Sequence, residues 1–166
     1  MDTYCEQLVK IKKGFKYYLA VIGIWFAAFV ITVLSFLFLR VLAAVIIVAA
    51  GYGAYYLCGF LSVEYEYIIT NGTLDIDIIY AKRSRKRIAS FELSNIESIE
   101  KYNGGPIDKR KFKGVFIACN KNDAEAYNLI VSSDSGTTVA VISPDDRTKQ
   151  EIVKFVPKYV GNTAFK

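Results

Sequence analysis

The apolar residues of this chain of 166 residues are concentrated in one long run near the N-terminus. Between Tyr17 and Val63 the sequence has a single charged residue, Arg40. As one straight helix the run would be roughly 70 Å long, whereas the hydrocarbon core of a bilayer is only about 30 Å thick. The pattern therefore predicts two transmembrane helices, Tyr17–Leu39 and Val41–Val63, that form a hairpin with its turn at Arg40, where the charge can reach water.

A signal peptide is the alternative interpretation of the first apolar stretch. Signal peptides have an apolar core of only about 7–15 residues, followed by a cleavage site of small residues. The stretch in this chain is longer, and no good cleavage site follows it. Both features favour the transmembrane hairpin.

The N-terminal tail, residues 1–16, is basic and amphipathic. Tyr4, Leu8, Ile11 and Phe15 recur at helical spacing, with lysines on the other side. This pattern is typical of a helix that lies in the membrane interface. The alternative is a frayed tail whose lysines only set the membrane topology.

After the apolar run the pattern changes to an alternation of apolar and polar residues, which is typical of β-strands. Glu64–Thr70 and Thr73–Tyr80 flank Asn71-Gly72, the strongest short signal for a β-hairpin. Further strands are predicted at Arg87–Leu93, Ile96–Tyr102, Val115–Cys119, Tyr127–Ser132 and Thr137–Ile142. Residues 64–166 are therefore expected to form a small β-rich domain.

A C-terminal helix at about residues 144–160 completes the predicted domain. Ser143 is a suitable N-cap, and Pro144 suits the first helical position. Pro157 is expected to end or kink the helix. The fold class is thus an α+β membrane protein, in which a two-helix transmembrane hairpin precedes an antiparallel β-barrel or sandwich with a C-terminal helix.

Basic residues lie outside the predicted hairpin on both flanks. Lys10, Lys12, Lys13 and Lys16 precede the first span, and a second basic run follows the second span. The turn between the spans carries Arg40 alone. By the positive-inside rule, a multi-pass plasma-membrane protein with both termini in the cytoplasm is expected.

Two segments carry a resemblance to a known family. Tyr65–Ile76 and Phe91–Ile96, on either side of the basic run, resemble the repeated strand pattern of bacterial pleckstrin-homology (PH)-like domains. Nearly the whole chain is similar to a family of small bacterial two-span membrane proteins with such a domain. The resemblance implies a PH-like fold, and it carries over no activity, because PH-like folds serve lipid, peptide and self-assembly roles alike.

The basic run is the candidate functional site. It consists of Lys82, Arg83, Arg85, Lys86 and Arg87, which we predict to be lipid-binding residues at the tip of a hairpin. Each basic residue near an anionic leaflet contributes about 1 kcal/mol to binding. The alternative is that these residues only set topology. A second candidate function is a scaffold or assembly subunit that binds a protein partner or forms a homo-oligomer through a sheet edge or the transmembrane faces.

Carboxylates gather on the outer face of the predicted hairpin. A two-residue turn would place Glu66 opposite Asp77, with Asp75 and Glu92 nearby. Like charges directly opposite each other are unfavourable in a sheet. A bound cation, a basic partner peptide, simple solvation or a different strand register would each account for this arrangement.

Catalytic, metal and cofactor chemistry find little support in the sequence. The chain has no histidine, and its cysteines, Cys5, Cys58 and Cys119, are widely separated, which argues against a catalytic triad and a zinc site. We therefore expect a non-enzymatic protein without cofactor or metal. A second basic cluster, formed by Lys109, Arg110, Lys111 and Lys113, has only one interleaved aromatic residue, Phe112, whereas nucleic-acid binding favours several. We therefore expect no nucleic-acid partner.

Overall fold

The computed structural model describes residues 3–108, 110–120, 123–133 and 136–165. Its contacts divide the chain into two compact units. The helical unit consists of Lys12–Val63 and the short segment Tyr80–Ser84. The β unit contains the residues through Ile11, Glu64–Ile79, and the chain from Arg85 onward.

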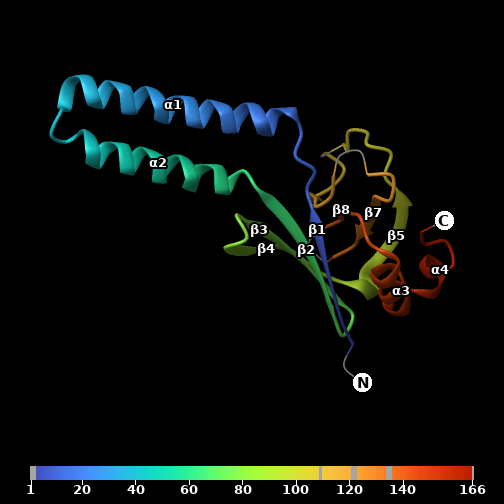
Figure 1. Cartoon of the computed structure of the whole chain (residues 1–166). Helices are drawn as coiled ribbons and strands as arrows, with labels where there is room; N and C mark the ends of the chain where they lie inside the picture. The colour runs from blue at the N-terminus through green and yellow to red at the C-terminus, as the bar shows by residue number, and fades with distance from the viewer. Residues whose placement is uncertain (1–2, 109, 121–122, 134–135, 166) are drawn as a thin grey trace. The chain divides into compact units, whose positions relative to one another are not determined.

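The helical unit is an antiparallel hairpin of α1 (Phe15–Leu39) and α2 (Ala43–Phe60) (Figure 1). Both helices are long and apolar enough to cross a bilayer. Arg40 lies in the connecting turn, as predicted, and has a positive φ of 25°. Many large apolar side chains point outward from both helices, including Phe29, Phe36 and Val48. Such a surface suits hydrocarbon better than water.

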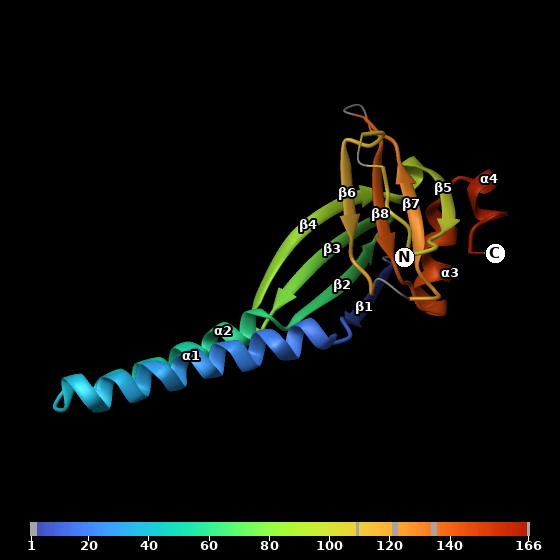
Figure 2. The same ribbon diagram turned by 90° about the horizontal axis from the view of Figure 1, so that it is seen from above.

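The first sheet of the β unit has four strands in the order β1-β2-β3-β4 (Figure 2). They are β1 (Tyr4–Lys10), β2 (Val63–Thr70), β3 (Thr73–Tyr80) and β4 (Ser84–Glu92). Strands β2 to β4 lie close to their predicted positions. The turn between β2 and β3 has positive φ at both Asn71 and Gly72, as a type I′ hairpin requires.

Strand β1 corrects the prediction of an interfacial helix in the N-terminal tail. It pairs antiparallel with β2, from Tyr4 opposite Thr70 to Lys10 opposite Glu64. Burial along this segment follows the period of two that is typical of a strand, since Cys5 and Val9 are buried in the core and Tyr4 is exposed. In a segment this short, helical and strand periodicities overlap, and the partner strand decides between them.

The second sheet has the strand order β5-β7-β8-β6. Its strands are β5 (Ile96–Lys101), β6 (Gly114–Ile117), β7 (Tyr127–Val131) and β8 (Thr138–Ile142), and a short 3₁₀ helix, η1 (Leu93–Asn95), precedes β5. Strand β6 runs parallel to β8, whereas an all-antiparallel arrangement was expected. Within the described strands the two sheets remain separate, so the expected β-barrel is not closed.

The C-terminal segment forms α3 (Asp146–Phe155) and the short α4 (Lys158–Gly161). Pro157 lies between them and so ends the first helix, as predicted. The N-cap of α3 is Asp145, whose carboxylate accepts a hydrogen bond from the Thr148 amide at 2.7 Å, and the prediction of Ser143 as the cap was wrong. The side chains of Ile152, Val156 and Val160 are buried in the core between the sheets.

Tyr67 connects the two sheets through the core. Its side chain is fully buried. Its hydroxyl donates a hydrogen bond to the Ala118 carbonyl and accepts one from the Ser143 amide at 3.1 Å. Burial raises the pKa of this hydroxyl, so it stays protonated and keeps both bonds.

Replacing Tyr67 with Phe should therefore lower the free energy of unfolding by about 1–3 kcal/mol, because a buried carbonyl and a half-buried amide each lose their partner. Tyr102→Phe is the matched control, since its hydroxyl bonds the Gly105 carbonyl at the exposed surface. Urea denaturation of the full chain in detergent micelles, followed by circular dichroism, measures both variants. Equal losses for the two would contradict the role assigned to Tyr67.

Candidate functional site

The segment Tyr80–Ser84 carries the first two residues of the basic run. Ala81 and Lys82 have positive φ angles of 54° and 57°, and the Arg83 amide donates to the Tyr80 carbonyl at 2.9 Å. The Ala81 amide donates to the Ser62 carbonyl at 2.9 Å. This turn is therefore fixed to the C-terminal end of α2, within the helical unit.

Arg83 is held against an aromatic side chain of α2. Its Nη2 donates a hydrogen bond of 2.8 Å to the Tyr55 hydroxyl, and its guanidinium carbon lies 5.3 Å from the centroid of the same ring. At the start of α1, Lys13 Nζ lies 4.7 Å from the centroid of the Tyr17 ring. Cation–aromatic contacts of this kind orient basic groups without neutralising their charge.

A cavity of about 250 Å³ lies between the turn and the ends of the two helices. Its lining combines two basic side chains and two tyrosines with small or apolar residues: Tyr17, Tyr55, Cys58, Gly59, Ser62, Ala81, Lys82 and Arg83. A Cβ atom added at Gly59 would lie 3.2 Å from Cβ of Ala81. The absence of a side chain at Gly59 therefore lets Ala81 of the turn approach α2 closely at this cavity.

Arg85 and Arg87 have a different role, on the outer face of the first sheet. Arg85 Nη2 lies 2.9 Å from Glu66 Oε1. Arg87 bridges two carboxylates, at 2.9 Å from Asp75 Oδ2 and 3.2 Å from Asp77 Oδ1. The acidic face recognised in the sequence is thus neutralised by two arginines of β4, one of which pairs with the adjacent β3 and the other with β2. No external cation is needed to explain the arrangement.

Glu66 is the most buried carboxylate of this face, at 2% exposure. Burial raises its pKa, the neighbouring Glu6 carboxyl raises it further, and Arg85 opposes both. The pKa of Glu6 is lowered, first by the hydrogen bond from the Tyr4 hydroxyl. Arg85 therefore favours the ionised form of Glu66.

The five predicted lipid-binding residues thus fall into two groups. Arg85 and Arg87 form ion pairs. Lys82, Arg83 and Lys86 are exposed and have no carboxylate within 4.0 Å among the described residues. In the second basic cluster, Lys109 lies outside the described residues. Of the predicted set, the turn residues Lys82 and Arg83 line a cavity.

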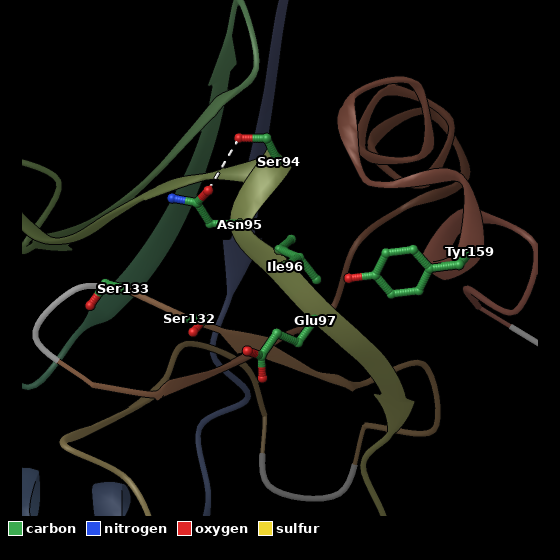
Figure 3. A pocket seen from close by; sticks show the side chains of 7 residues that line it. All are labelled: Ser94, Asn95, Ile96, Glu97, Ser132, Ser133 and Tyr159. Atoms are coloured by element: carbon green, nitrogen blue, oxygen red, sulfur yellow. Dashed lines mark hydrogen bonds between the residues drawn. The ribbon is translucent and has the colours of Figure 1, made fainter.

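A second cavity, of about 470 Å³, is lined mainly by polar residues of the β unit (Figure 3). These are Ser94, Asn95, Ile96, Glu97, Ser132, Ser133 and Tyr159. Its one charged side chain is a carboxylate, which disfavours an anionic ligand. Across the described residues, no group of acidic, histidine or cysteine side chains is arranged to hold a metal ion.

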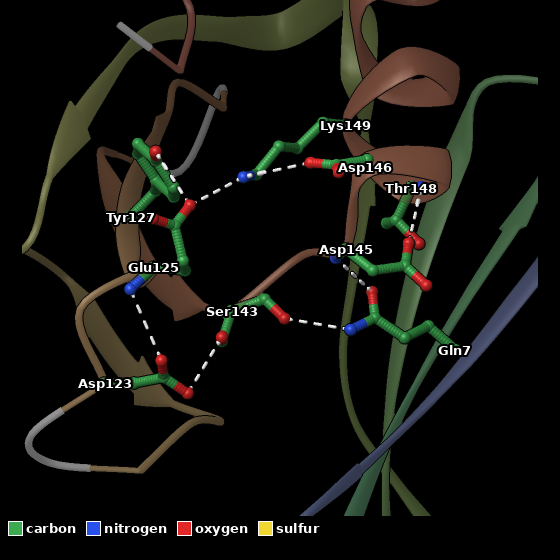
Figure 4. A network of polar contacts seen from close by, with 9 residues as sticks. All are labelled: Gln7, Asp123, Glu125, Tyr127, Ser143, Asp145, Asp146, Thr148 and Lys149. Atoms are coloured by element: carbon green, nitrogen blue, oxygen red, sulfur yellow. Dashed lines mark hydrogen bonds and ion pairs between the residues drawn. The ribbon is translucent and has the colours of Figure 1, made fainter.

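A polar network that was not recognised in the sequence joins β1 to the start of α3 (Figure 4). The Gln7 side chain donates to the Ser143 carbonyl at 3.0 Å and accepts from the Asp145 amide at 2.9 Å. Ser143 in turn donates to Asp123 at 2.9 Å. These bonds satisfy backbone groups and stabilise the fold.

Cys119 is equally structural, because burial raises the pKa of its thiol to about 11.

Replacing Arg85 with Gln should lower the free energy of unfolding by about 1–3 kcal/mol near pH 7.5, because ionised Glu66 loses its charge partner in a buried position. A carboxyl with a raised pKa binds its proton more tightly in the folded state, so its stabilising effect decreases as pH rises through that pKa. The loss should therefore shrink as the pH is lowered through the raised pKa of Glu66, because the carboxyl becomes protonated.

The double variant Glu66→Gln/Arg85→Gln should recover most of the stability lost near neutral pH, and Arg147→Gln, at an exposed position, is the matched control. Denaturation curves across the pH range measure all of these variants. A cost of Arg85→Gln that is independent of pH, or that persists in the double variant, would contradict the pairing with Glu66.

Comparison with known families agrees with the architecture. A profile of the bacterial PH-like domain family (DUF6106) matches residues 1–162, which include both apolar helices and both sheets. Neither curated proteins nor solved structures give a significant match. The match confirms the resemblance drawn from Tyr65–Ile76 and Phe91–Ile96. The chain belongs to the bacterial PH-like domain family.

Proposed function

We propose that this protein is a non-enzymatic, membrane-anchored PH-like module that binds anionic lipid headgroups at the inner surface of the plasma membrane. The observation that carries the proposal is the basic turn after β3, where Lys82 and Arg83 lie within the same compact unit as the two apolar helices. A cation fixed beside the end of a membrane-spanning helix is placed at headgroup depth.

The pairing of β1 with β2 supports one topology. Strand β1 precedes the helical hairpin, β2 follows it, and the two pair over their full length. If α1 and α2 cross the bilayer, both ends of the hairpin must then leave it on the same side. The lysines before α1 and the basic turn after β3 favour the cytoplasmic side.

The ion pairs of the first sheet reduce the set of residues that we expect to contact lipid. Arg85 and Arg87 are committed to Glu66, Asp75 and Asp77. Lys82, Arg83 and Lys86 therefore form the leading lipid-contacting set, hereafter the lipid triad. The arginines on the sheet contribute through the net positive charge of the surface rather than by direct contact.

A second candidate function, a scaffold or assembly subunit, is favoured by the open sheets. The first sheet ends in β1 and β4, and the second ends in β5 and β6. Edge strands offer backbone groups to a partner strand, and Ile117 on β6 is an exposed apolar residue at such an edge. Self-association or partner binding through an edge would not require the lipid triad.

The proposal predicts preferential binding of anionic lipid. The full chain in neutral detergent, mixed with equal amounts of phosphatidylglycerol and phosphatidylcholine, should retain phosphatidylglycerol in native mass spectrometry. High salt should weaken the preference, because screening reduces the attraction between exposed charges. Replacing the lipid triad with Gln should remove most of it.

The control variant Lys111→Gln/Arg147→Gln/Lys158→Gln changes the net charge equally at exposed positions outside the turn. This variant should keep the preference. Equal retention of both lipids by the wild-type chain, or an equal loss in both triple variants, would refute the proposal. Binding that is unaffected by either change, together with dimers in the spectrum, would favour the assembly function.

A further inference from the structure

We propose that the cavity at the end of the helical hairpin is a stoichiometric site for one phospholipid with a small anionic headgroup. The inference rests on the proposed function and deepens it, because it replaces diffuse attraction to a charged leaflet with a shaped site. The cavity is the one lined by Lys82, Arg83 and the ends of α1 and α2.

Arg83 is pre-positioned to bind a phosphate. A guanidinium has five N–H donors, and the Tyr55 hydroxyl accepts a bond from Nη2 alone, at 2.8 Å. The ring of Tyr55 supports the same group from the side, 5.3 Å from centroid to guanidinium carbon. Fixing the side chain before the ligand arrives reduces the entropy that binding costs.

Lys82 reaches the cavity through an unusual backbone conformation. Ala81 and Lys82 both have positive φ, a conformation that is unfavourable for residues other than glycine. The Arg83 and Ala81 amides hold this conformation by bonds to Tyr80 and Ser62. Two adjacent cations, Lys82 and Arg83, thereby line one cavity.

The remaining lining is suited to the apolar part of a lipid. Cys58, Gly59 and Ala81 offer small, weakly polar surface, and Tyr17 and Tyr55 add aromatic rings with hydroxyls. Tyr17 lies near the start of α1 and Gly59 near the end of α2, so the cavity lies at the end of the hairpin opposite the Arg40 turn. Free phosphate would use the cations alone, whereas a phospholipid uses both parts of the lining.

The size of the cavity limits the headgroup. Pockets for drug-sized ligands have volumes of about 300–1,000 Å³, and this cavity holds about 250 Å³. A phosphate with a glycerol is a better match for this space than a bulky sugar headgroup. We therefore assign the site to lipids of the phosphatidylglycerol or phosphatidic acid type.

Gly59 allows a test that blocks the space without changing charge. Its added Cβ would meet Ala81 at 3.2 Å, whereas nothing lies within 4 Å of an added Cβ at Gly51 on the same helix. Gly59→Leu should reduce the affinity for phosphatidylglycerol by about tenfold or more, as should Lys82→Gln/Arg83→Gln, whereas Gly51→Leu should leave it unchanged. Lipid titration of the full chain in neutral detergent, read by native mass spectrometry, gives stoichiometry and affinity.

Cys58 provides a second measurement on the unaltered chain, because it lines the cavity while Cys5 and Cys119 are buried. Saturating phosphatidylglycerol should slow alkylation of Cys58 by a small maleimide, and inorganic phosphate at the same concentration should not. This measurement decides the question if Gly59→Leu does not fold.

Saturation at one lipid per chain, sensitive to Gly59→Leu, with protection of Cys58, supports the site. Binding of several phosphatidylglycerol molecules that depends on the lipid triad and ignores Gly59→Leu, without protection, would overturn the site and leave the proposed function standing. Equal protection by inorganic phosphate would overturn the assignment to a lipid. No preference for anionic lipid at all would refute both proposals.

Discussion

The pairing of β1 with β2 is the constraint on which the β unit depends. Strand β1 lies before the helical hairpin in the chain and completes a sheet whose other strands follow that hairpin. It also brings Cys5 and Val9 into the core and Gln7 to the start of α3. A fragment that begins at Glu64 would lose these contacts and expose an edge of β2, so the full chain is the appropriate material for folding and binding measurements.

Some charged residues of this protein form ion pairs that stabilise the fold, and others remain unpaired at the surface. The buried carboxylates Glu66 and Asp77 would repel each other if left alone, and the arginines of β4 make the arrangement tolerable. Because these arginines remain half exposed, the desolvation cost of the pairs falls mainly on the carboxylates. The basic run in the sequence thus separates into two groups in the structure. One group forms ion pairs on the sheet, and the other forms a cationic turn at the helices.

The sequence predicted correctly those turns whose position is determined by the residues within them. Arg40 marked the helical turn because a charge is costly within an apolar run, and Asn71-Gly72 marked the hairpin because both positions need positive φ. Strand β1 and the parallel β6 depend on partners distant in the sequence, which periodicity cannot identify. The ion pairs were missed for a related reason. Strict alternation places Arg87 on the core side with Ala89, yet both Arg87 and Ser90 contact Asp75, so the alternation shifts within β4.

The cavity was beyond sequence reasoning because the turn that forms it breaks the usual preferences. Among the described residues of the first sheet, two turns have positive φ at both central residues. Asn71-Gly72 connects β2 to β3, and Ala81-Lys82 lies in the connection from β3 to β4. The first follows the preference for this geometry and the second contradicts it. Gly72 serves packing, since an added Cβ would lie 3.1 Å from Phe155. Lys82, at the equivalent position of the second turn, is exposed and lines the cavity. The strained backbone at Lys82 places its charge beside that of Arg83, and local strain of this kind is typical of functional sites.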